Sequence, residues 1–465
     1  MASLALVFLA LLLPTISWLW DYIIVPHIWR PYIAAKRLRE QGIRGPPYKF
    51  LKGCNEDVKK MKDAADDLVL DVHDHNYLPR ESPLYTGLGQ SLESASSTMS
   101  GPGRFFQAND DKTMVACAQN MVKELEDQAS SNKNGETQVE LDKQFQELTA
   151  DIISHTAFGS SYKLGIEAFH AQKELQEIAV KSLLNVQIPG FSYLPTKGNW
   201  RKLTLEKKLR GTLMQIIQSR LSSKGSGYGS DLLGLMLEAC IATDQGREQH
   251  QLSLSIDEII HECKTFFFAG HETTSLLLTW TVFLLSVYPE WQARLRLEAL
   301  RECGKENPNG DNLSKLKEAR KLMSMVFLET LRLYGPALFL QRKPLTDITV
   351  GETKIPKDHA IIIPSAIMHR DKEIWGDDTD EFNPLRFQNG VTRAAKVPHA
   401  LLAFSIGPRS CIGQNFAMLE AKSVMAMILK KFSFTLSPNY VHAPVDLLTL
   451  QPKFGLPVVL RLLDA

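Results

Sequence analysis

The sequence predicts a mainly α-helical protein with a small β-sheet. Apolar residues recur at intervals of three and four over Leu141–Phe158 and Leu203–Leu221, the spacing of amphipathic helices. Two short stretches, DITVGETKIP and HAIIIPSA, combine β-branched residues with turn residues and predict strands. Helices should therefore form most of the body, with the strands as a minority.

The longest predicted helix begins at the tetrapeptide SIDE and ends before Pro289. Ser255 can cap its first turn while Glu258 reaches back, which is a capping box. The helix is apolar on nearly all sides over Phe266–Leu285, so it should cross the interior of one large domain. Five ionisable residues argue against a membrane span here, and they are His261, Glu262, Lys264, His271 and Glu272.

Composition limits the classes of function. The 465 residues with 44% hydrophobic content can bury a substantial core. The net charge of +1, from 53 basic and 52 acidic residues, gives no sign of a nucleic-acid-binding surface. The six cysteines form no C-x-x-C pair, so their spacing indicates neither a disulfide framework nor a structural zinc site. A reducing compartment is expected.

The first twenty residues carry no charged side chain and would span about 30 Å as a helix, the thickness of a membrane's hydrocarbon core. A cleaved signal peptide is the alternative, but that would favour a basic start and small residues at the end. Here Trp18 and Trp20 precede several basic residues, which favours an uncleaved anchor with the body in the cytosol. We expect an anchor at 1–29, a basic, proline-containing hinge at 30–53 and one catalytic domain at 54–465.

Inside the longest helix lies AGHETT, at Ala269–Thr274. A mid-helix glycine costs about 1 kcal/mol relative to alanine, so Gly270 requires a reason. Either something approaches the backbone closely there and Thr273 opens a polar notch, or the segment is simply a helix crossing that tolerates polar groups. A zinc-protease motif is excluded because Ser275 stands where H-E-x-x-H needs its second histidine.

A second motif, FLETLRLYGP, places Glu329 and Arg332 three residues apart on one helix face. Such a pair usually lies on the surface, where it stabilises the helix by only a few tenths of a kcal/mol. Its apolar neighbours predict that it is buried, and buried charges need further partners. Arg386, within FNPLRF, is a candidate third member.

The third motif is FSIGPRSCIG at Phe404–Gly413, a cysteine between two glycines and close to an arginine. The order A-G-x-E-T, E-x-x-R, F-x-P-x-R-F and F-x-x-G-x-R-x-C-x-G resembles the cytochrome P450 family. Longer stretches such as LETLRLYGP and FSIGPRSCIGQNFAMLEAK are similar to plant P450s of the clan with cytokinin hydroxylases, brassinosteroid-inactivating enzymes and fatty-acid hydroxylases.

The resemblance implies the P450 fold with an N-terminal transmembrane anchor, and a haem b cofactor whose iron is bound by the Cys411 thiolate. It also implies that Thr273 and Glu272 relay protons to reduced dioxygen, with Gly270 making room over the iron. The remaining residues implied for haem binding lie in the cysteine loop, on the strand after the E-x-x-R helix and on the long helix: Phe404, Gly407, Arg409, Gly413, Arg342 and Ala269.

The implied activity is hydroxylation of a small apolar substrate at the endoplasmic reticulum membrane, with electrons from NADPH passed on by a P450 reductase. Two alternatives stay open, a P450-type hydroperoxide isomerase and an inactive remnant. The second arises because the family's W-x-x-x-R helix has no counterpart, with no tryptophan between Trp29 and Trp200. We therefore expect that a segment around 88–104 has been lost.

Overall fold

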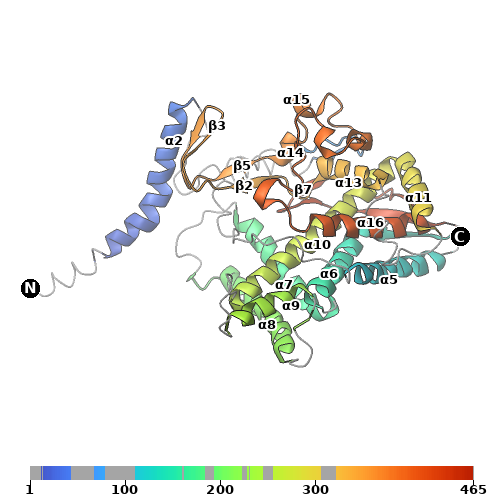
Figure 1. Ribbon diagram of the computed structural model, residues 1–465, viewed down its shortest axis with the longest axis horizontal. Helices are drawn as coiled ribbons and strands as arrows, with labels where there is room; N and C mark the ends of the chain where they lie inside the picture. The colour runs from blue at the N-terminus through green and yellow to red at the C-terminus, as the bar shows by residue number, and fades with distance from the viewer. Residues whose placement is uncertain are drawn as a thin grey trace, which may run out of the picture.

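The computed structural model describes residues 12, 14–42, 68–78, 110–132, 134–159, 162–183, 193–222, 228–229, 231–244, 255–304 and 321–463. Helices dominate these residues, as the sequence predicts (Figure 1). The α-helices are α2 (Arg30–Glu40), α5 (Asp110–Ser130), α6 (Leu141–Phe158), α7 (Tyr162–Leu183), α8 (Lys197–Ser222), α9 (Leu232–Asp244), α10 (Ile256–Val287), α11 (Pro289–Cys303), α13 (Lys321–Tyr334), α14 (Ser365–Met368), α15 (Lys372–Trp375) and α16 (Gln414–Lys431). A π-helix, η1 (Trp20–Trp29), precedes α2, and three 3₁₀ helices lie near the C-terminal end: η5 (Pro384–Phe387), η6 (Val391–Arg393) and η7 (Gly407–Arg409).

The strands form small antiparallel sheets. One has the order β1-β9-β6, and the others are the pairs β2-β5, β3-β4 and β7-β8. Their bounds are β1 (Glu136–Glu140), β2 (Leu340–Arg342), β3 (Ile348–Val350), β4 (Thr353–Ile355), β5 (Ile361–Ile363), β6 (Phe432–Leu436), β7 (Pro444–Asp446), β8 (Leu450–Pro452) and β9 (Pro457–Leu462). The strands predicted in DITVGETKIP and HAIIIPSA are thus confirmed as β3, β4 and β5.

Helix α10 crosses the body diagonally, with α6 packed along it (Figure 1). Its capping box is present: the Glu258 N–H donates to Ser255 Oγ at 3.2 Å, and the Ser255 N–H donates to Glu258 Oε2 at 2.7 Å. From Thr274 to Leu285 every residue is buried. The prediction of a long interior helix is therefore confirmed.

Trp280 anchors the centre of the core on α10. It is fully buried, its ring stacks on Tyr334 with centroids 4.6 Å apart, and its Nε1–H donates to the Leu450 carbonyl at 2.9 Å. One side chain thereby joins α10 to α13 and to the β7-β8 hairpin. Helices α10 and α13 and this hairpin also carry the polar and charged groups described below.

At the N-terminal end, α2 projects from the body beside the β3-β4 hairpin (Figure 1). The Lys354 N–H donates to Gln41 Oε1 at 2.7 Å and Gln41 Nε2 donates to the Lys354 carbonyl at 3.2 Å. Of the residues that the structure describes, none lies in a helix both long and apolar enough to cross a membrane. Most of the apolar stretch expected to form the anchor, residues 1–11 and 13, lies outside them.

Two buried histidines make the fold sensitive to acid. His75 Nδ1 and Nε2 lie 2.9 Å from the hydroxyls of Tyr334 and Tyr288, and His369 Nε2 accepts the Leu402 N–H at 2.9 Å. Burial, with nearby Arg370 for His75 and Arg332 for His369, lowers the pKa of each imidazole to about 3. As the pH falls, the unfolded chain protonates these histidines before the folded chain does. Their contribution to the unfolding free energy is therefore fully present above the unfolded pKa of about 6.5 and is lost as the pH drops toward 3.

When the pH is lowered from 6.5 to 5, we expect each of these histidines to lower the free energy of unfolding by about 2 kcal/mol. Buried acids such as Asp142, whose pKa is raised to about 6, act in the opposite direction. The contribution of His75 is therefore measured as the difference in pH slope between wild type and His75→Gln in urea unfolding. Exposed His73→Gln is the control. Equal slopes in wild type and His75→Gln would contradict the prediction.

Candidate active site

The cysteine loop runs through η7 into the first turn of α16. The Cys411 N–H donates to the Phe404 carbonyl at 2.8 Å, which closes the loop. Gly407 has φ +77, a left-handed conformation that a side chain would strain, so this glycine is required by the turn. The loop ends at Gly413, directly before α16 begins at Gln414.

The Cys411 side chain is exposed, and its sulfur lies at the N-terminus of α16. Partial burial raises the pKa of the thiol, while the backbone N–H groups of Gly413 and Gln414, which donate to the sulfur, lower it. A helix N-terminus with two N–H donors favours a negative charge. The loop is therefore built to hold a thiolate once a metal supplies the remaining stabilisation.

Arg342 reaches this loop from β2. Its Nη2 donates to Ser405 Oγ at 2.7 Å, next to half-buried Phe404. Arg409, in η7, is exposed, and among the described residues no hydrogen-bond or ion-pair partner holds it. Two cationic side chains therefore belong to this region: Arg342 is held by a hydrogen bond, and Arg409 is exposed to solvent.

Helix α10 presents an accessible stripe that ends where its fully buried part begins. Thr265 and Ala269 are exposed and Thr273 is half-buried, at intervals of four residues. The Thr273 hydroxyl donates to the Ala269 carbonyl at 2.7 Å, the local bond that the sequence predicts. The stripe thus combines a small residue with a hydroxyl.

Glu272 points away from that stripe. Its Oε1 accepts hydrogen bonds from Gln451 Nε2 at 2.6 Å and Thr449 Oγ1 at 3.1 Å, both on or beside the β7-β8 hairpin. Its Oε2 lies 3.6 Å from Nε2 of buried His271. Burial lowers the pKa of His271 and the Glu272 carboxylate opposes that effect. The contacts with Thr449 and Gln451 were not predicted, because only the folded chain brings residues so distant in sequence together.

Gly270 makes room for a neighbouring helix. A Cβ at this position would lie 2.8 Å from Cδ1 and 2.9 Å from Cγ1 of Ile153 on α6. The close approach expected at this glycine is therefore present, but the group that approaches is a side chain of α6. The observed packing favours the helix-crossing interpretation of this position.

We expect Gly270→Ala to destabilise the protein by about 1–2 kcal/mol, since overpacking outweighs the gain in helix propensity. Gly211→Ala is the matched control: it lies on α8 with nothing within 4 Å of the new Cβ, and should stabilise by about 0.5–1 kcal/mol. In a double-mutant cycle, Ile153→Ala should reduce the destabilisation that Gly270→Ala causes, because it removes the side chain that the new Cβ meets. Urea unfolding of the wild type, the two single variants and the double variant measures this coupling. Additive effects would contradict the contact.

The predicted charge cluster behind the cysteine loop is confirmed. Arg332 is 1% exposed, and its Nε and Nη2 donate to the two carboxylate oxygens of Glu329, each at 2.8 Å. Its Nη1 and Nη2 also donate to the carbonyls of His369, Thr379 and Glu381. Arg386 Nε lies 3.6 Å from Glu329 Oε1, and Arg386 also bonds Asp378 at 2.8 Å. Glu329, Arg332 and Arg386 each have an oppositely charged partner, which is the arrangement expected of a structural cluster.

The residues fit a haem group. A thiolate at a helix N-terminus suits an iron ligand, Arg342 and Arg409 suit the two propionates, and the accessible stripe of α10 offers a surface without large side chains. Sequence reasoning identified these residues except Thr265, and the structure brings Arg342, Phe404 and Cys411 into one region.

The chain is similar to known proteins over most of its length. A family model described as "Cytochrome P450" matches residues 94–457. The chain is 42% identical over 521 aligned positions to cytochrome P450 709B3 of Arabidopsis thaliana, covering 99% of each chain. It is 36% identical to secologanin synthase 1 of Catharanthus roseus, with 96% of each covered, and 34% identical to cytochrome P450 734A1 of Arabidopsis thaliana, with 93% of this chain and 92% of the relative covered.

Coverage of 99% of both chains does not support the expectation that a segment around 88–104 has been lost, although gaps make that alignment longer than the 465 residues of the chain. The range 88–104 also lies outside the described residues.

Proposed function

Because the chain belongs to the cytochrome P450 family, among the plant relatives of its 72, 709 and 734 groups, we propose that it is a monooxygenase that hydroxylates a small apolar substrate. The family implies a haem-thiolate cofactor, and we assign haem b to the loop of Cys411. The observation that carries the proposal is the position of the Cys411 sulfur at the start of α16, where the backbone N–H groups of Gly413 and Gln414 donate to it.

The reaction takes one substrate C–H, one O₂ and two electrons with two protons, and gives one alcohol and one water. NADPH is the electron source, through NADPH-cytochrome P450 reductase. The bound haem would activate dioxygen; its sulfur ligand supplies electron density. Arg342 and Arg409 would hold the propionates, Phe404 would pack beside the ring, and Gly407 and Gly413 allow the tight loop.

The protein's contribution to proton movement is assigned to Thr273 and Glu272. The Thr273 hydroxyl faces the accessible stripe of α10 and can hold a proton donor or a water there. Glu272 is buried next to His271 and Thr449, and this cluster can store a proton behind the stripe. Rotation of the Glu272 carboxylate would bring it toward the hydroxyl of Thr273, the next residue in the sequence.

We further propose that residues 1–29 anchor the protein in the endoplasmic reticulum membrane with the catalytic domain in the cytosol, where the reductase acts. The apolar start of the chain and the aromatic residues that end it support this placement. Ala269 and the phenylalanines before it in α10, together with Leu447, would offer an apolar surface to an apolar substrate.

The function is tested by Thr273→Ala and Thr273→Ser in a reconstituted system with reductase. Alanine should lower the ratio of product formed to NADPH consumed by about 100-fold, the low end for loss of acid-base assistance, while serine should restore most of it. Turnover that continues without NADPH would instead favour the hydroperoxide isomerase. Identical ratios in wild type and the alanine variant would refute the role of Thr273.

A further inference from the structure

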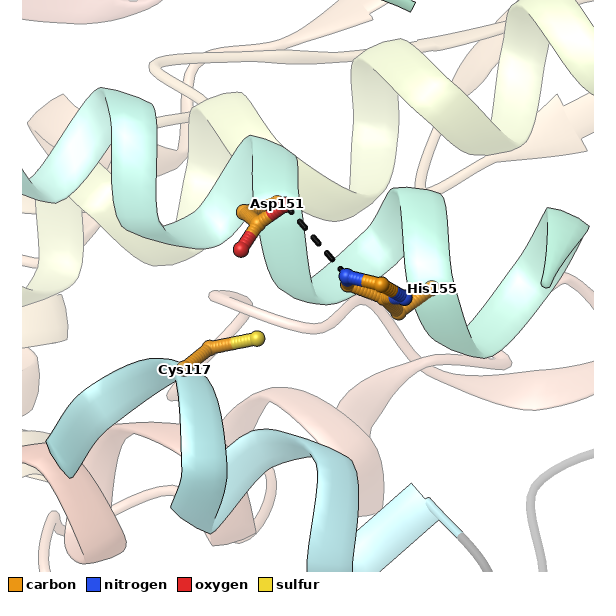
Figure 2. Close-up of side chains that lie close together, drawn as sticks. All are labelled: Cys117, Asp151 and His155. Atoms are coloured by element: carbon orange, nitrogen blue, oxygen red, sulfur yellow. Dashed lines mark ion pairs between the residues drawn. The ribbon is translucent and has the colours of Figure 1, made fainter. Parts of the chain in front are cut away.

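A group of metal-binding side chains lies outside the proposed haem site, between α5 and α6. Cys117 on α5 faces Asp151 and His155 of α6 (Figure 2), and one ligand atom of each lies within 4.8 Å of the other two. Asp151 and His155 are four residues apart, so they share one face of their helix. Cys117 is buried and the other two side chains are half-buried.

The three donors form a set that zinc prefers: thiolate sulfur, imidazole nitrogen and carboxylate oxygen. Neighbouring nitrogen and oxygen ligands of a tetrahedral zinc lie about 3.4 Å apart, given bond lengths of roughly 2.0–2.2 Å. His155 Nε2 and Asp151 Oδ1 are 3.7 Å apart, so a small rotation of either side chain would complete this geometry. Calcium or magnesium would not choose the sulfur.

Glu420 provides an independent sign that a cation belongs here. It lies on α16, is 1% exposed, and neither of its carboxylate oxygens has a hydrogen-bond partner among the described residues. It is close enough to Cys117 for its charge to raise the pKa of the thiol. Burial raises the pKa of Glu420 well above its usual range, so without a cation this group stays protonated. A divalent cation at the three donors would stabilise its charged carboxylate form.

We propose that Cys117, Asp151 and His155 bind one zinc ion, with water in the fourth position and the charge of Glu420 close by. The ion would join α5 to α6 beside α16. The thiol proton would leave to solvent when the metal binds.

A hydrogen-bonded thiol is the competing account, in which Cys117 donates to Asp151 and no metal binds. A nucleophilic cysteine is excluded, because burial raises the pKa of this thiol to about 12, whereas reactive thiols have lowered values. The spacing of the cysteines did not indicate zinc because this site takes its ligands from two helices and contains only one cysteine.

The test uses the haem-loaded full chain, zinc chloride and metal analysis after dialysis. We expect one zinc per chain and, in X-ray absorption at the zinc edge, a sulfur neighbour at about 2.3 Å. Cys117→Ser should abolish the sulfur signal and reduce zinc affinity at least tenfold. Cys263→Ser, which removes another buried thiol on α10, should change neither.

Two further variants separate binding from folding. Asp151→Asn should lower the affinity about as strongly as Cys117→Ser, while Glu420→Gln should weaken it tenfold or more and keep the sulfur neighbour. Zinc should raise the melting temperature of wild type and of Cys263→Ser but not of Cys117→Ser. Zinc well below one per chain, or a sulfur signal that survives in Cys117→Ser, would overturn the proposal.

Discussion

Glu329→Ala should destabilise the protein by about 3–5 kcal/mol, the cost of removing one partner from a buried ion pair. The Arg332 guanidinium would lose both of its carboxylate acceptors, and the Asn383 N–H, which donates to Glu329 Oε1 at 3.0 Å, would lose its acceptor as well. Arg386 would lose the nearest charge to its Nε. Since an ordinary domain is stable by about 5–15 kcal/mol, this single change would remove a large share of its unfolding free energy.

The matched control is an exposed pair of the same shape. Glu174 accepts from Arg201 Nε and Nη2, both at 2.6 Å, but both side chains are exposed to solvent. Glu174→Ala should therefore cost less than about 1 kcal/mol. Urea unfolding of both variants gives the two values. A loss below about 1 kcal/mol for Glu329→Ala would show that the buried cluster is not a structural centre.

Cys411→Ser should remove thiolate ligation and lower substrate turnover by about 100-fold or more, beyond the loss known for groups that only support a metal ligand. Serine has the same shape but its hydroxyl does not ionise near neutral pH, so the α16 N-terminus would no longer hold an anion. The fold should survive, because Cys411 is exposed and its backbone bond to Phe404 is unchanged.

Haem content, the absorption spectrum and turnover of Cys411→Ser are compared with those of Cys263→Ser. Cys263 is 1% exposed and lies on α10, outside the cysteine loop in sequence, so its variant should keep the wild-type spectrum. An unchanged spectrum in Cys411→Ser would exclude this residue as the iron ligand.

Helix positions could be predicted from the sequence because their signals are local. The capping box of Ser255 and Glu258 and the proline at 289 lie within a few residues of the ends they define, and α6 spans the predicted Leu141–Phe158. The Glu329–Arg332 pair could also be predicted as buried, since its apolar neighbours surround it on the same helix.

Other features depend on contacts between distant segments and could not be predicted. Ile153 occupies the space beside Gly270 only because α6 packs along α10. The side of α10 to which Glu272 turns depends on the β7-β8 hairpin. The cluster of Cys117 with α6 likewise forms only when two helices pack.

The central claim is that a cysteine thiolate at position 411 ligates haem iron. The most direct measurement is the difference spectrum of the wild-type protein, reduced and then treated with carbon monoxide, with and without added hemin during expression. We predict the strongly red-shifted band that distinguishes thiolate-ligated haem from haem with a neutral axial ligand. Protein that retains no haem, or that shows only the band of neutral ligation, would contradict the account.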